Sequence, residues 1–245
     1  MNALEEATVG ALVAAKPARA ALFDKLSIDF CCGGKATLSE ACLKANLAVE
    51  EVGRMLEEFD RCDTALTAAE EPDWLKASLT DLADHIVQTH HAYLNQELPR
   101  LAALVAKVAA VHGQKDGRLL ELKNVFEALK SELETHTGKE EKILFPYIRS
   151  LDSRSLDAAA RKRQPVFGTV LNPVRCMENE HEDAGQALVK MRELTDQYRA
   201  PQGACNSWLA LLDGLEKLDK DLRIHIHKEN SILFPRAIAS ELSGK

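Results

Sequence analysis

The chain has 245 residues, of which 28% are charged, and its formal net charge is −7, so it is long enough for one large domain or for a small and a medium one. The acidic balance gives no electrostatic reason to expect nucleic acid or an anionic membrane as a partner. Because the sequence lacks a run of about 18 apolar residues and begins with an acidic segment, we expect no membrane span and no secretory signal, and hence a cytoplasmic protein whose six cysteines are reduced.

Nearly the whole sequence has the periodicity of helices, and no stretch shows the two-residue alternation of strands. Residues 1–62 predict a small N-terminal domain of short helices, broken at Lys16-Pro17 and at Cys31-Cys32-Gly33-Gly34. Residues 63–77 lose this periodicity around the segment Glu70-Glu71-Pro72-Asp73. We interpret residues 63–77 as a linker.

Four longer helices are predicted over residues 78–111, 118–149, 172–198 and 206–240, separated by turns that contain glycine or proline. Ser78 with Asp81 fits a capping pair, and Pro173 fits the first turn of the third helix. Helices of this length with short connections predict an antiparallel four-helix bundle over residues 78–245. The predicted fold class is therefore all-α, with a small helical domain followed by the bundle.

The second and fourth of these helices repeat one pattern. The segment His136-x3-Glu140-x2-Ile143-Leu144-Phe145-Pro146 matches His225-x3-Glu229-x2-Ile232-Leu233-Phe234-Pro235. In both copies the histidine and the glutamate lie on the apolar face that a period of 3.6 residues turns inward. Burying these groups is costly unless something pairs with them, and a metal ion shared between the two copies is the simplest partner.

The first and third helices each supply one further inward histidine, His85 and His181. Imidazole and carboxylate ligands suit iron, and glutamates from two facing helices can bridge a pair of metal ions. With an oxo or hydroxo bridge each ion would have about five ligands and one open position for O2, peroxide or NO. The predicted ligands are His85, His136, Glu140, His181, His225 and Glu229.

Three acids, Asp81, Glu132 and Asp221, lie four residues before a predicted histidine ligand. A ligating imidazole usually donates its other N–H to a carboxylate or a carbonyl, so these acids are candidates for that role. The alternative is that they lie on the wet flank of the apolar stripe. Of the remaining histidines, we expect His90 and His91 to be solvated or interfacial and His227 to face away from the centre.

Cys31 and Cys32 are followed by two glycines, which let the backbone turn tightly and expose the thiols. Adjacent cysteines form a disulfide only through a strained ring. We therefore predict thiol exchange or transient iron binding at this pair, and the sequence leaves open which of the two applies.

The bundle pattern resembles the hemerythrin-like di-iron domain, and Asp29-Phe30-Cys31-Cys32-Gly33-Gly34-Lys35 resembles the N-terminal domain of the ScdA/YtfE-type repair of iron centres family. This resemblance covers nearly the whole chain, and it maps the family's metal ligands onto the same residues that helix geometry selects. It implies a homodimeric protein with two non-haem iron ions per chain, which helps to restore iron–sulfur clusters after nitrosative or oxidative damage.

Three classes of function are considered, of which the first is the one that the resemblance implies. The first is a stress-response protein that acts on damaged iron–sulfur proteins by donating iron or by handling NO. The second is reversible binding or sensing of O2 or NO, and the third is redox catalysis at the di-iron centre, acting on NO or peroxide. No catalytic residue is predicted, because the sequence has no Ser–His–Asp arrangement, phosphate loop or dinucleotide fingerprint.

Overall fold

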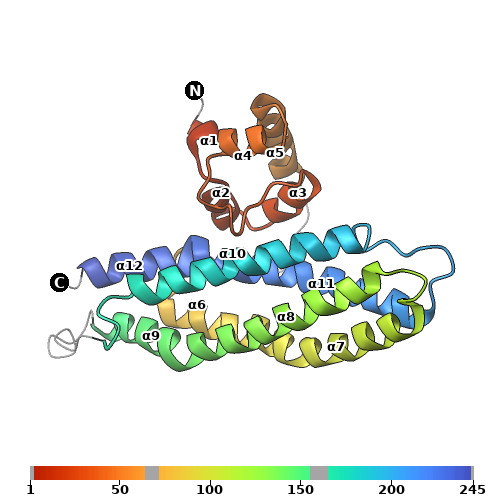
Figure 1. Ribbon diagram of the computed structural model, residues 1–245. Helices are drawn as coiled ribbons and strands as arrows, with labels where there is room; N and C mark the ends of the chain where they lie inside the picture. Colours follow the sequence, from red (N-terminus) through yellow and green to blue (C-terminus); the bar gives the residue numbers. More distant parts are fainter. Residues whose placement is uncertain (1–2, 64–71, 155–164, 244–245) are drawn as a thin grey trace.

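The computed structural model describes residues 3–63, 72–154 and 165–243. Within these ranges the chain is helical apart from its connections and an isolated β-bridge between Thr8 and Thr37, which confirms the all-α prediction. A small group of helices stands on the side of a long four-helix bundle (Figure 1). Most of the linker predicted over residues 63–77 lies outside the described residues. None of the described helices combines the length and the apolar composition that crossing a membrane requires.

The N-terminal domain is built from short helices that cover a compact apolar core. Thr8 caps α2 through a hydrogen bond from the Ala11 amide, and Thr37 forms a capping box with Glu40 at the start of α4. The loop between α3 and α4 carries the adjacent cysteines. The helices are α1 (Ala3–Glu6), α2 (Val9–Ala15), α3 (Arg19–Lys25), α4 (Leu38–Lys44) and α5 (Val49–Asp63).

Four long rods form the bundle, and three of them contain a short π-helical segment. The α7 helix packs against α8 and α11, and α8 packs against α10, as expected for an antiparallel bundle. The rods are α6 (Leu79–Ile86), η1 (Val87–His91) and α7 (Ala92–His112); α8 (Arg118–Lys139), η2 (Glu140–Leu144) and α9 (Phe145–Arg154); α10 (Leu171–Leu194); and α11 (Asn206–Lys228), η4 (Glu229–Leu233) and α12 (Phe234–Ser243).

The third rod ends at Leu194 rather than at the predicted residue 198. Asp196, Gln197 and Tyr198 have φ angles of 51°, 62° and 60°, which is the left-handed region. That conformation costs roughly 1–2 kcal/mol per residue, so contacts elsewhere must hold it. One of them is the hydrogen bond of 2.7 Å that the Tyr198 hydroxyl donates to the buried carboxylate of Asp219.

The π-helical segments η2 and η4 explain why the repeated motif ends in proline. Pro146 and Pro235 have no N–H to donate, and each ring crowds the carbonyl one turn earlier. The preceding turn widens, so that the Phe145 amide donates to the Glu140 carbonyl and the Phe234 amide donates to the Glu229 carbonyl, five residues back. Such wide turns occur frequently at functional sites, and here each begins at a glutamate of the repeated motif.

Two clusters of buried apolar side chains fill the bundle, one toward each end. The larger cluster includes Phe126 and Leu218 and continues into the N-terminal domain. The smaller one includes Phe145 and Phe234 and lies toward α6, α9 and α12. The buried histidines and glutamates of the repeated motif lie in sequence between the residues of these clusters. The polar centre is thus enclosed by apolar packing along the bundle axis.

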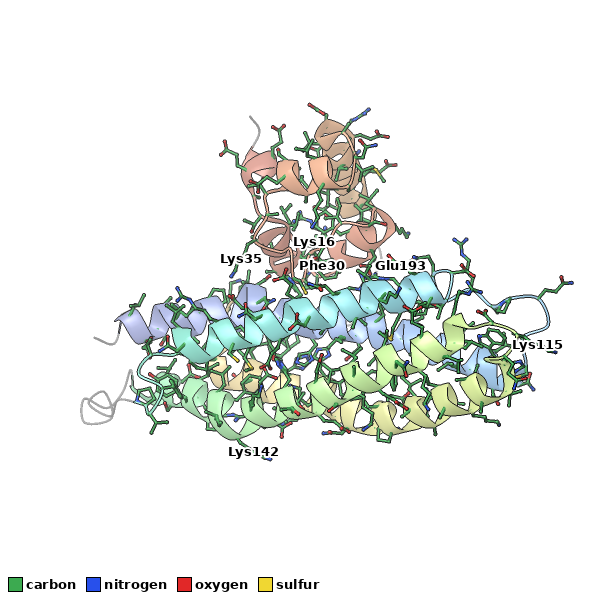
Figure 2. The ribbon with its side chains drawn as sticks, viewed as in Figure 1. Lys16, Phe30, Lys35, Lys115, Lys142 and Glu193 are labelled. Carbon is green, nitrogen blue, oxygen red and sulfur yellow. The ribbon has the colours of Figure 1, made fainter. Side chains whose placement is uncertain are left out.

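The N-terminal domain docks on α10, α11 and η4 through charged and aromatic contacts. Arg223 of α11 donates to Asp219 at 2.7 Å and pairs with Asp24 of the N-terminal domain. Lys35 forms an ion pair of 2.8 Å with Glu178 of α10. Figure 2 shows Lys35 and Phe30 at the junction between the domain and the bundle.

His227 is buried at this junction, where its ring and that of Phe30 form a T-shaped pair with a centroid distance of 5.7 Å. Burial lowers its pKa to about 4, and the positive charge of Lys228 contributes. An unfolded histidine titrates near 6.5, so between about pH 6.5 and pH 4 the unfolded chain binds a proton that the folded chain does not. His227 therefore contributes stability that is complete above about pH 6.5 and is lost as the pH falls toward 4.

We expect this loss to reach about 3 kcal/mol at most. Urea unfolding of the wild-type chain and of His227→Leu between pH 4 and 7.5 measures it, because the variant has no group to titrate at that position. The difference between the two free energies of unfolding should change with pH in this window. A constant difference would show that His227 charges as readily in the folded chain as in the unfolded one.

Candidate metal centre

Six side chains converge between the two apolar clusters, and none of them is more than 3% exposed. Two are glutamates that begin the π-helical segments, and four are histidines, one from each rod. Their positions are set by the repeated motif and by the wide turns next to it. They are His91 at the end of η1, His136 in α8, Glu140 in η2, His181 in α10, His225 in α11 and Glu229 in η4.

Each glutamate faces two histidines through its two oxygens. Glu140 Oε1 lies 3.4 Å from His136 Nε2, and Glu140 Oε2 lies 3.3 Å from His91 Nε2. Glu229 Oε2 lies 3.1 Å from His181 Nε2, and Glu229 Oε1 lies 3.1 Å from His225 Nε2. The side chains thus form two groups that share both carboxylates, one with His91 and His225 and the other with His136 and His181.

The outer nitrogens of three imidazoles fix which ring nitrogen faces the centre. The Nδ1 atoms of His91, His136 and His181 lie 2.8 Å from oxygens of Glu141, Glu180 and Asn230, respectively. These oxygens only accept hydrogen bonds, so each Nδ1 carries the proton that it donates. In the neutral ring, Nε2 then presents a lone pair to the centre, which is the arrangement of a metal ligand.

The centre has more acceptors than donors. Both oxygens of Glu140, Oε2 of Glu229 and Nε2 of His91 are buried without a hydrogen bond. His136 Nε2 and His181 Nε2 face each other at 3.0 Å, although both are acceptors in the neutral tautomers. Buried acceptors without donors are costly, and cations shared by the two carboxylates would satisfy all of them. The donor set therefore fits a pair of divalent metal ions.

When no metal ion is bound, protons on the imidazoles balance part of the negative charge of Glu140 and Glu229. Burial opposes protonation of His136, but the charges of Glu140 and Glu229 outweigh it and raise the pKa of His136 to about 9. Burial likewise raises the pKa of Glu229 by itself, whereas His225 and His181 hold that pKa well below its usual range. His136 is thus an imidazolium at neutral pH, and a metal ion must displace its proton.

Metal uptake should therefore release at least about one proton per chain at pH 7. The apparent association constant should rise about tenfold for each pH unit between pH 6 and 8, because His136 loses its proton only near pH 9 in the metal-free chain. Calorimetric titration of the metal-free protein with Zn²⁺, in buffers of different ionisation enthalpy, counts these protons. An association constant that does not change with pH would contradict the proposed role of His136.

The comparisons with known proteins agree with this geometry. The family described as hemerythrin HHE cation binding domain matches residues 83–237, and ScdA_N, a domain of unknown function, matches residues 5–60. A protein of Pectobacterium atrosepticum called iron–sulfur cluster repair protein YtfE is 38% identical over 239 residues, covering 98% of this chain and 100% of that protein. Its counterpart in Escherichia coli O157:H7 is 35% identical over 242 residues, with the same coverage. This chain belongs to the YtfE family.

All six converging residues of this YtfE family chain lie inside the cation-binding domain. The domain match and the surplus of buried acceptors lead to the same assignment, because each alone indicates a metal site. The bundle is a metal-cation-binding domain of the hemerythrin type.

The structure brings together five of the six predicted ligands and places His91, not His85, with them. His85 is half-buried on the rim of the bundle, where its ring lies on Trp74 and its Nε2 accepts a hydrogen bond of 2.8 Å from Lys228. His90 and His91 were expected to be solvated or interfacial, but they are only 3% and 1% exposed, and His91 faces Glu140 in the centre. His227 does lie outside the group of converging side chains, as predicted.

The spacing of the repeat contains the signal that selects His91. His225 follows His181 by 44 residues, and His136 follows His91 by 45, whereas His136 follows His85 by 51. A straight α-helix places residue 91 on a different face from residue 85, but the π-helical segment η1 (Val87–His91) widens the turn between them. The periodicity of an undistorted helix therefore selected the wrong histidine.

The predicted orienting acids are also corrected. Asp81 and Glu132 are exposed, and Asp221 accepts a hydrogen bond of 2.9 Å from His90 instead. The partners that hold the ligand imidazoles come from neighbouring rods, and each is the sequence neighbour of another ligand: Glu141 follows Glu140, Glu180 precedes His181, and Asn230 follows Glu229. This position brings the side chain to the outer nitrogen of a histidine on a neighbouring rod.

The adjacent cysteines lie against the bundle beside His181. The loop turns as predicted, but Cys31 is only 4% exposed, so the expectation of two exposed thiols was wrong. The sulfur atoms are free thiols 3.8 Å apart, and Asp29 accepts hydrogen bonds from the backbone of both cysteines. The hydrogen bond with Cys32 and burial raise the pKa of Cys31 well above its usual range, so Cys31 is a thiol at neutral pH.

Proposed function

We propose that this centre holds two iron ions per chain, bridged by Glu140 and Glu229, and that the chain assists the repair of iron–sulfur clusters damaged by nitrosative or oxidative stress. The observation that supports the di-iron assignment is the pair of histidine groups that share two carboxylates. The repair function is supported by the relatives, which are called iron–sulfur cluster repair proteins and match this chain along 98% of its length.

The residues of the centre suit iron that is both held and given up. Four imidazoles and two carboxylates carry much less negative charge than a set of thiolates. Divalent iron should therefore dissociate from this centre more readily than from a thiolate site. Bound iron supplies redox chemistry and open coordination positions for small ligands such as NO or O2. Glu141 and Glu180 increase the basicity of the histidines they hold, and the apolar clusters on both sides restrict water.

Iron donation is the mechanism that the surroundings of the centre favour. The Cys32 thiol lies 3.2 Å from the carbonyl of His181, and both cysteines line a cavity of about 520 Å³ at the junction with the N-terminal domain. Thiols beside a histidine ligand offer a transient site to iron that leaves the centre. The partner would be a damaged iron–sulfur protein, and we propose that the chain acts as a homodimer.

Mössbauer spectroscopy of ⁵⁷Fe-loaded protein, followed by a repair assay, tests this proposal. About two antiferromagnetically coupled irons per chain are expected. The loaded protein should then restore activity to an iron–sulfur dehydratase that has been inactivated with NO, and the Glu229→Ala variant should not. A single uncoupled metal ion would contradict the bridged centre. A coupled centre that restores no activity would contradict the repair function alone.

Binding of O2 or NO is the second candidate, and the apolar packing around the centre favours it because small uncharged molecules enter such surroundings readily. A sensor would bind its ligand reversibly while retaining its iron. A redox enzyme would consume NO or peroxide over many turnovers with an added reductant. The iron content of this chain, measured after repair of the dehydratase, separates these alternatives from iron donation. A sensor or a redox enzyme would retain its iron, whereas a donor would lose it.

A further inference from the structure

Asn230 joins the metal centre to the cysteine loop. Its Oδ1 accepts the hydrogen bond of 2.8 Å from His181 Nδ1, and its Nδ2 donates a longer one, 3.4 Å, to the carbonyl of Cys31. One amide group therefore contacts a ligand imidazole on one side and the N-terminal domain on the other. Movement of the loop at Cys31 changes the position of the group that orients His181.

The second cysteine contacts the same histidine by another route. The Cys32 thiol donates to the main-chain carbonyl of His181 at 3.2 Å. One turn further along α10, Gly185 makes room for this thiol, because a Cβ atom there would lie 2.9 Å from Cys32 Sγ. Both cysteines are thus connected to His181. Cys31 is connected through Asn230, and Cys32 contacts the His181 carbonyl directly.

The two metal positions differ in this respect. The group with His91 and His225 has its outer hydrogen bond from His91 to Glu141, a residue of the bundle. In the other group, His136 is held by Glu180 and His181 by Asn230. Both partners belong to the bundle, but Asn230 also contacts the cysteine loop. Asn230 is moreover a neutral amide, which polarises an imidazole less than a carboxylate does. In the group with His91, the Nδ1 atom of His225 is buried without a hydrogen-bond partner among the described residues. Of the four ligand imidazoles, His181 is therefore the one whose outer partner also contacts the cysteine loop.

The cavity at the junction gives small molecules access to this connection. Cys31, Cys32 and Asn230 line it together with Lys35 and Glu178, which form the ion pair at its edge. A metal ion or a thiol-reactive molecule that enters the cavity therefore meets the thiols and the amide at the same place.

We propose that Asn230 couples the state of the Cys31–Cys32 pair to one metal position only, the one between His136 and His181. When the thiols are occupied, Cys32 no longer donates to the His181 carbonyl, the loop no longer holds Asn230, and the metal ion at this position dissociates faster. The ion between His91 and His225 keeps its rate. This inference rests on the proposed di-iron function, and it names the ion that is exchanged and the groups that control the exchange.

Release of Fe²⁺ to a chromogenic chelator under anaerobic conditions tests the coupling. The full chain is loaded with two irons, and release is followed before and after treatment with methyl methanethiosulfonate. This reagent converts each accessible S–H to S–S–CH3 and releases methanesulfinate. We expect one iron per chain to leave about tenfold faster after treatment, while the other keeps its rate. The Cys31→Ser/Cys32→Ser variant reports the contribution of the other cysteines and should show no acceleration.

Two substitutions of Asn230 separate coupling from structure. In Asn230→Ala both hydrogen bonds are lost, so one iron should leave fast whether or not the thiols are modified. In Asn230→Asp the carboxylate still accepts from His181 but donates nothing to Cys31, so the iron should be held at least as firmly as in the wild type. The reagent should then accelerate its release much less than in the wild type, because only the direct contact of Cys32 with His181 remains. Asn179→Ala, which alters the same cavity, is the matched control and should behave as the wild type.

Equal acceleration of both irons, or the same response in Asn230→Asp as in the wild type, would overturn the coupling. Mössbauer spectra give a second measurement, because modification of the thiols should change one of the two iron subspectra and not the other. Iron content before release distinguishes the two levels of inference: fewer than about two irons in the untreated wild type contradicts the proposed function, whereas two irons with an unselective response contradicts only the coupling.

Discussion

Replacing Glu140 by alanine is expected to remove both metal ions from the centre, because one oxygen of this carboxylate faces His136 and the other faces His91. Glu229→Ala should have the same effect, since its oxygens face His181 and His225. Metal content should fall from about two ions per chain to well below one. Mass-spectrometric metal analysis of protein purified from iron-replete cells measures this directly.

Histidine variants provide the contrast. His91→Ala should weaken mainly one metal position, because His91 belongs to only one of the two groups, and His85→Ala should leave the metal content unchanged. Glu140→Gln keeps the volume of the side chain and removes its charge, so its behaviour separates a loss of ligation from a packing defect. Equal loss in His85→Ala and His91→Ala, or a tightly held single ion in Glu140→Ala, would disprove the shared-carboxylate arrangement.

Replacing Arg223 by alanine is expected to lower the free energy of unfolding by about 3 kcal/mol. Arg223 lies between Asp219, which is 1% exposed, and Asp24 of the N-terminal domain. Its removal leaves a buried carboxylate with only Tyr198 and the more distant Arg192, 3.4 Å away. The expected loss is at the lower end of the range for buried pairs, because Asp24 is partly exposed and because these two partners remain.

Urea unfolding monitored by circular dichroism measures the effect of Arg223→Ala. The matched control is Lys35→Ala, which removes a second ion pair between the domain and the bundle, that with Glu178. The Lys35 side chain is 74% exposed, so the control should lose less than about 1 kcal/mol. Similar losses in the two variants would show that burial of the Arg223 network contributes little to docking.

The architecture was predictable because its determinants are local. Apolar residues at helical spacing, glycine and proline between them, and caps such as Ser78 with Asp81 fix where the rods begin and how they pack. The end of α10 was not predictable in this way. Asp196 to Tyr198 adopt left-handed conformations that their residue types do not favour, and Asp219, about 20 residues further along the sequence, holds Tyr198 in place.

The residues of the centre could be predicted where the sequence repeats itself. The prediction failed where the helix geometry departs from 3.6 residues per turn. His136, Glu140, His225 and Glu229 follow from the repeated motif, and His181 follows from its apolar neighbours. His91 requires knowledge of the π-helical turn before it, or a comparison of spacing between the halves. Glu180 and Asn230 depend on which rods face each other, and periodicity along a single helix carries no information on that point.

Each metal position draws one histidine from the first pair of rods and one from the second: His91 with His225, and His136 with His181. Neither half of the repeat holds a complete set of ligands by itself. The repeated motif indicates that the bundle arose by duplication of a chain with two rods. Such a half-length chain would have completed the centre only by pairing with a second copy of itself. The intramolecular contact between the halves therefore has the ligand arrangement of a two-fold symmetric dimer, and the connection between α9 and α10 makes that pairing independent of protein concentration.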